Sequence, residues 1–142
     1  MGDKNLKVYG LDVSSKAALP MYSAKVSAGF PSPAEDYIEG KIDLNKELVA
    51  KPGDTFFVRV TGNSMINAGI KENDVLIVDR SLEPRHNKIV IAVVDGELTV
   101  KRLLKRHNKV ILAPENEQYP ALEITSQELS IWGVVTYIIH KA

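Results

Sequence analysis

Three short segments of this chain carry residue types that could together perform nucleophilic chemistry. In the first, Ser64 follows Gly62-Asn63, a pair that permits a tight turn with positive φ. A serine that opens the next helical turn has free backbone N–H groups beside it, and those of Asn63 and Ser64 could hold a developing oxyanion. A serine that merely caps a turn fits this segment equally well, so Ser64 needs a partner base before it indicates chemistry.

Lys101 is the candidate base, because no histidine is placed to complete a Ser-His-Asp triad. A free lysine, with a pKa of about 10.4, is a poor base at pH 7, but burial in apolar surroundings can lower that pKa by several units. Lys101 lies in the strand-like run 97–103, where side chains alternate between two faces. If one face is core, either Lys101 or Arg102 must point away from solvent. A solvated lysine on an edge strand is the alternative.

The third segment is a potential substrate within the chain, Val26-Ser27-Ala28-Gly29-Phe30-Pro31. The small residues Ala28 and Gly29 would let a backbone approach a nucleophile closely. A flexible hinge ahead of Pro31 explains the same composition. Each of the three segments is a weak signal when it is taken separately.

Composition narrows the classes of function that remain. The 142 residues fit one domain, and 44% hydrophobic with 25% charged residues is an ordinary globular balance. Lysine plus arginine equals aspartate plus glutamate at 18 each, so we expect no direct sequence-specific DNA binding. The chain has no cysteine and its three histidines are far apart, so we expect no metal or other cofactor. No apolar run reaches the roughly 18 residues of a membrane span and no signal peptide is recognisable, which favours a cytoplasmic protein without a membrane partner.

Most of the chain after residue 54 has the pattern of short strands. Asp95-Gly96 between two β-branched runs predicts a hairpin with a type I′ turn. Ser32-Pro33-Ala34-Glu35 should begin a short helix through residues 36–38, and Asp43 should cap a second over residues 44–48. Residues 1–31 are read as an extended arm with at most one short strand. The expected strands cover residues 55–60, 75–79, 88–94, 97–103, 109–113 and 131–139, and they indicate a mostly antiparallel β-fold.

The order of these motifs resembles the LexA/UmuD family of self-cleaving serine peptidases. The resemblance runs from about Leu19 to Tyr137 and includes the cleavage region 29–37, the nucleophile motif 62–65 and the lysine strand 96–103. It implies a mostly β protein, a compact antiparallel β-fold of the LexA/UmuD peptidase type with short helices and an extended N-terminal arm. It also implies an arm of residues 1–28 that is removed by self-cleavage, and a Ser/Lys peptidase domain of residues 29–142.

The resemblance also implies a role for each matching residue. Ser64 would be the nucleophile, Lys101 the general base, and the bond between Ala28 and Gly29 the one that is cut. Arg102 adds a second cation beside Lys101, which would discourage protonation of the lysine if it lay close. The implied partners are a second copy of the chain in a homodimer, the RecA filament on single-stranded DNA, and a UmuC-type translesion DNA polymerase. The implied process is error-prone synthesis in the SOS response.

Three other interpretations compete with self-cleavage. One is a regulatory interaction subunit of a translesion polymerase that has no proteolytic activity. A second is a LexA-like repressor fragment, although only 28 residues precede the expected cleavage site and a helix-turn-helix module needs roughly 60. The third is a signal peptidase, which also uses a serine nucleophile with a lysine base but needs a membrane span.

Overall fold

The structure, a computed structural model, describes residues 6–10, 18–22, 38–124 and 130–142. The chain divides into two compact units, one formed by residues 1–11 with 53–142 and the other by residues 12–52. The expected arm, residues 1–28, therefore contributes strands to both units. Each unit is described separately below.

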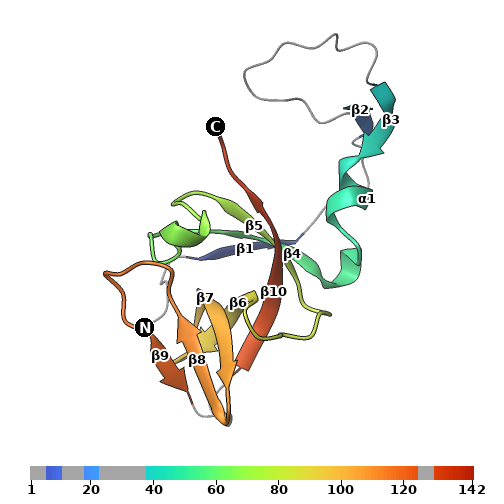
Figure 1. Ribbon diagram of the computed structural model, residues 1–142. Coiled ribbons are helices and arrows are strands. Elements are labelled where there is room, and N and C mark those ends of the chain that lie inside the picture. Colours follow the sequence, from blue (N-terminus) through green and yellow to red (C-terminus); the bar gives the residue numbers. More distant parts are fainter. Residues whose placement is uncertain (1–5, 11–17, 23–37, 125–129) are drawn as a thin grey trace. The chain divides into compact units, whose positions relative to one another are not determined.

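The larger unit is built on one antiparallel sheet of eight strands in the order β1-β4-β5-β10-β6-β7-β8-β9 (Figure 1). The mostly β fold class expected from the sequence is confirmed. Short 3₁₀ turns at Pro52–Asp54 and Ile66–Ala68 flank β4. The strands are β1 (Lys7–Gly10), β4 (Thr55–Arg59), β5 (Val75–Asp79), β6 (Ile89–Val94), β7 (Glu97–Arg106), β8 (Lys109–Ala113), β9 (Leu122–Ile124) and β10 (Ser130–Ile139).

The six strands expected after residue 54 all form, and local turn chemistry explains their pairing. Asp95 and Gly96 both have positive φ, at 51° and 78°, as a type I′ turn requires, and they join β6 to β7 in register. His107 also has positive φ, at 53°, in the turn between β7 and β8. Residues 1–31 were expected to hold at most one short strand, but two form there, β1 in this unit and Ala18–Tyr22 in the smaller unit. The sequence did not predict β9. Both β1 and β9 are short, and both occupy an edge of the sheet, where burial leaves a weaker pattern in the sequence.

The long strand β10 joins the two halves of this sheet. It pairs with β5 on one side and with β6 on the other, and its register shifts between Ile131 and Gly133 and again between Val135 and Tyr137 (Figure 1). Such bulges bend a strand and increase its twist, which lets one strand serve both halves. At Gly133 a Cβ atom would lie only 2.5 Å from Val78 Cγ1, so β10 crosses β5 more closely there than a side chain permits.

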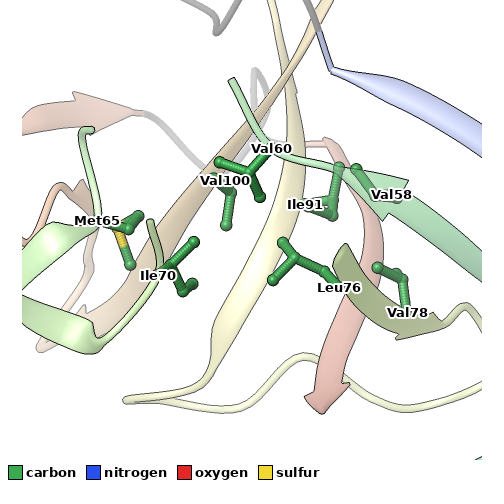
Figure 2. Packing of buried hydrophobic residues seen from close by; sticks show 8 residues of the cluster. All are labelled: Val58, Val60, Met65, Ile70, Leu76, Val78, Ile91 and Val100. Carbon is green, nitrogen blue, oxygen red and sulfur yellow. The ribbon is translucent and has the colours of Figure 1, made fainter. Parts of the chain in front are cut away.

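Two groups of buried side chains fill the larger unit. The first, which we call core 1, is shown in Figure 2 and consists of Val58, Val60, Met65, Ile70, Leu76, Val78, Ile91 and Val100. The second, core 2, consists of Val90, Ala92, Leu103, Leu112 and Val134. Because β6, β7 and β10 carry residues of one core or the other along their length, both faces of the central strands are covered. A polar side chain in the middle of β7 is therefore withdrawn from water.

The smaller unit contains a two-stranded antiparallel sheet and one short helix. The sheet consists of β2 (Ala18–Tyr22) and β3 (Ile38–Asp43), and α1 (Leu44–Leu48) follows directly. Asp43 caps α1 as expected, since its Oδ1 accepts a hydrogen bond of 3.0 Å from the Asn45 N–H. The helix expected at residues 32–38 falls mostly outside the described residues, but Ile38 belongs to β3 and not to a helix. No helix in the described part of the chain is long and apolar enough to cross a membrane.

The close crossing at Gly133 gives a prediction about stability. Gly133→Ala should lower the free energy of unfolding by about 1–3 kcal/mol, because the added methyl group meets the buried Val78 side chain. Gly53→Ala is the matched control, since its Cβ would meet nothing within 4 Å. Urea denaturation followed by Trp132 fluorescence measures both variants. Equal stabilities for the two would show that β10 does not approach β5 as described.

Candidate active site

Ser64 sits at the start of a compact turn that follows β4. Gly62 takes positive φ, at 88°, and Ile66 N–H then donates to the Asn63 carbonyl at 3.2 Å. The 3₁₀ turn Ile66–Ala68 continues the segment and ends at Gly69, which adopts the left-handed conformation with φ 81°. The positive φ expected from Gly62-Asn63 is therefore found at Gly62, and the helical turn begins two residues after Ser64.

Core packing fixes the position of this turn. Met65, directly after Ser64, is 1% exposed and belongs to core 1 together with Val100, the residue directly before Lys101. Figure 2 shows Met65 and Ile70 in the same group of side chains as Val100. Each member of the candidate pair is thus the sequence neighbour of a side chain anchored in the same core.

The structure brings Ser64 and Lys101 into direct contact inside the protein. Lys101 Nζ lies 3.2 Å from Ser64 Oγ, and both residues are almost fully buried, at 4% and 3% exposed. The lysine also donates to Thr99 Oγ1 at 2.8 Å and to the Val100 carbonyl at 3.0 Å. The sequence assigned no role to Thr99. Its place two residues before Lys101 was the signal that could have marked it as a partner.

These three contacts match the three donors of an ammonium ion, and they are also compatible with a neutral amine that acts as a base. A neutral lysine has two N–H bonds and one lone pair, so it can donate to Thr99 and to Val100 and still accept the Ser64 proton. Burial at 4% exposure disfavours the charged ammonium form, because a charge loses its hydration there. The contact is somewhat longer than an ideal hydrogen bond, as catalytic contacts often are before a substrate is bound.

The Arg102 guanidinium is hydrogen-bonded to residues other than Lys101. Its Nε donates to Glu115 Oε1, and its Nη1 donates to the Asn87 carbonyl at 2.7 Å. The guanidinium is therefore paired with a carboxylate that compensates its charge. The expectation that one of the two cations on β7 points inward is confirmed, and it is Lys101 that does so.

The remaining expected site residues have separate outcomes. The backbone N–H groups of Asn63 and Ser64 donate no hydrogen bond within the part of the chain that the structure describes. Ala28 and Gly29 lie outside the described residues. Among those described, no three histidine, aspartate or glutamate side chains gather closely enough to hold a metal ion.

The structure thus places a serine in the turn after β4 against a lysine on β7 inside an antiparallel sheet protein, and comparison with known proteins identifies the family. The family model described as Peptidase S24-like matches residues 20–136, so this chain belongs to that family. The family resemblance inferred from the sequence is confirmed.

Named relatives agree with this assignment. The chain is 44% identical to the protein ImpA of Escherichia coli over 122 residues, which cover 86% of this chain and 83% of ImpA. It is 44% identical to the protein SamA of Salmonella typhimurium over 126 residues, which cover 89% and 88% of the two chains. A LexA repressor from Erwinia tasmaniensis is 38% identical over 133 residues, which cover 92% of this chain and 65% of the repressor.

The anchoring role of Met65 gives a second prediction. Met65→Ala should lower the free energy of unfolding by about 2–5 kcal/mol, because it leaves a cavity in core 1. Ile66→Ala, one residue further along the same turn, should cost far less since Ile66 is 37% exposed. Urea unfolding measures both losses, provided that the slope of the unfolding free energy against urea concentration is the same as in the wild-type chain. A loss at Ile66 as large as that at Met65 would contradict the proposed anchoring of the turn.

Proposed function

We propose that this protein is a self-cleaving serine endopeptidase in which Ser64 cuts the bond between Ala28 and Gly29 and Lys101 is the base. The observation that carries the proposal is the buried contact of 3.2 Å between Lys101 Nζ and Ser64 Oγ in a chain of the Peptidase S24-like family. The product would be residues 29–142.

The chemistry follows from the positions of the two side chains. Neutral Lys101 accepts the Ser64 proton while Ser64 Oγ attacks the Ala28 carbonyl carbon. The N–H groups of Asn63 and Ser64 stabilise the oxyanion, and Lys101 then gives the proton to the departing amine of Gly29. Water, deprotonated by the same lysine, hydrolyses the ester on Ser64. Because the substrate is part of the same chain, its effective concentration at the site is high once the segment reaches it.

We extend the proposal to the biological setting implied by the family. A RecA filament on single-stranded DNA would favour the pose in which the cleavage segment reaches Ser64, which amounts to a shift in population. The processed chain, as a homodimer, would act with a UmuC-type translesion polymerase in SOS mutagenesis. The similarity to ImpA and SamA supports this setting, because the chain is 44% identical to each of them and 38% identical to the LexA repressor.

Loss of either member of the pair should abolish processing. Ser64→Ala and Lys101→Ala, incubated with RecA, single-stranded DNA and ATP, should yield no product starting at Gly29, whereas the wild-type chain should. Ser130→Ala, an exposed serine on β10, is the matched control and should be cut normally. N-terminal sequencing and intact mass identify the product. Processing of Ser64→Ala at the same bond would refute the proposal in favour of an interaction subunit that another protease matures.

The base mechanism predicts how the rate depends on pH. Only the neutral amine can accept the proton, so cleavage without RecA should accelerate about tenfold per pH unit until Lys101 is mostly deprotonated. Lys101→Arg should be inactive at every pH, because a guanidinium does not deprotonate in proteins. Gel assays from pH 6 to 10 measure both chains. A wild-type rate that is flat over this range would rule out the neutral lysine.

A further inference from the structure

The segment after β8 lies beside the turn that contains Ser64, which we call the nucleophile turn, and is hydrogen-bonded to its backbone. Glu115 N–H donates to the Ser64 carbonyl at 2.8 Å, and Asn67 N–H donates to the Glu115 carbonyl at 2.7 Å. One residue of this segment therefore holds the turn on both sides of Met65. Asn67 and Glu115, together with the next residue Asn116, line a hollow of about 290 Å³ beside the turn.

Asn116 adds a side-chain contact on the other side of Ser64. Its Nδ2 donates to the Asn63 carbonyl at 2.8 Å, while its Oδ1 accepts from Gln118 N–H at 3.0 Å. Both ends of the amide are engaged, so its orientation is defined. An aspartate has the same shape but could not donate to the Asn63 carbonyl when it is ionised.

Peptide planarity links these contacts to the proposed oxyanion site. The carbonyl of Asn63 and the N–H of Ser64 belong to one planar trans peptide, so they point in opposite directions. A hydrogen bond that holds the Asn63 carbonyl therefore also aims the Ser64 N–H. The Glu115 bond to the Ser64 carbonyl fixes the following peptide in the same way. The direction of the proposed oxyanion donor is thus set from within the turn, by the Ile66 N–H on the Asn63 carbonyl, and from outside it, by the Asn116 amide.

Arg102 connects the segment that contains Glu115 and Asn116 to the strand that carries the base. It follows Lys101 on β7, and its guanidinium bridges the Glu115 side chain and the Asn87 carbonyl. The Arg102 and Glu115 side chains are 24% and 32% exposed, so this pair is partly withdrawn from water. The strand that carries Lys101 therefore also positions the segment that is hydrogen-bonded to the Ser64 backbone.

We propose that Asn116 and Glu115, the latter held by Arg102, are positioning residues that orient the Ser64 peptide for oxyanion binding. This inference rests on the proposed function. None of the three side chains needs to touch the substrate, because each acts through the backbone of the turn. Their loss should slow the chemical step without changing the pH at which Lys101 becomes a base.

The test uses the full chain and two measurements of Ser64. The first is the rate of cleavage without RecA at alkaline pH. The second is the rate at which an organophosphorus fluoridate labels Ser64, followed by intact mass, because this probe needs the hydroxyl and the oxyanion donors but not the cleavage segment. Asn116→Asp should slow both rates by about tenfold or more, since losing a whole oxyanion donor costs about 10²–10³-fold. Asn108→Asp, in the exposed turn after β7, is the matched control.

A purely structural role would give a different pattern. It would lower the urea midpoint and leave labelling by the folded chain unchanged, which would overturn the inference. Normal rates for Asn116→Asp would overturn it as well. A variant that slows both reactions with unchanged pH midpoint and unchanged urea midpoint supports it.

Charge exchange at the second contact provides an independent check if Asn116→Asp does not fold. Arg102→Glu and Glu115→Arg should each slow labelling, and the double exchange should recover most of the lost rate by restoring the ion pair. No recovery would overturn the role given to Arg102. If the wild-type chain neither cleaves itself nor labels at Ser64, both the proposed function and this inference are refuted. If the wild-type chain cleaves itself and labels at Ser64 and every variant does so at the same rates, only the positioning role of Asn116, Glu115 and Arg102 is wrong.

Discussion

The buried contact between a lysine amine and a serine hydroxyl is the constraint on which the rest of this structure depends. An ammonium ion at 4% exposure is costly, because it gives up its hydration for a few hydrogen bonds. The same burial makes the amine useful as a base, since it favours the neutral form. The position of Lys101 is therefore better explained by reactivity than by stability, which an apolar side chain of similar volume would serve at least as well.

The fold meets this constraint by covering both faces of one strand. In the middle of β7, Thr99, Val100 and Lys101 are all buried, although their side chains alternate between faces. Core 1 takes Val100 and core 2 takes Leu103, so the strand lies between two packed layers. Covering both faces in this way depends on β10, which pairs with β5 and with β6 and bends at two bulges. A flat sheet with one wet face would have left Lys101 hydrated, without the burial that disfavours its charged form.

The proposed cleavage site does not lie at a boundary between the two compact units of the chain. The bond between Ala28 and Gly29 separates residues 1–28 from the rest, yet β1 pairs with β4 in the larger unit and β2 pairs with β3 in the smaller one. Both strands of the expected arm are therefore hydrogen-bonded to residues beyond that bond. Leu6 also packs against core 1. The described parts of the arm therefore belong to the folded intact chain.

The sequence by itself determined the features that depend on local chemistry. Alternation and β-branched residues predicted six strands, Asp95-Gly96 predicted the hairpin that places Lys101, and the ordered motifs around Ser64 and Lys101 indicated the family. Tertiary structure decided which of Lys101 and Arg102 faces inward, because the covering of a strand face comes from residues distant in sequence. It also decided that Glu115 and Asn116 hold the Ser64 turn, since those contacts join segments about fifty residues apart through backbone groups that every residue possesses. No local pattern marks such a contact, so only the folded chain could reveal it.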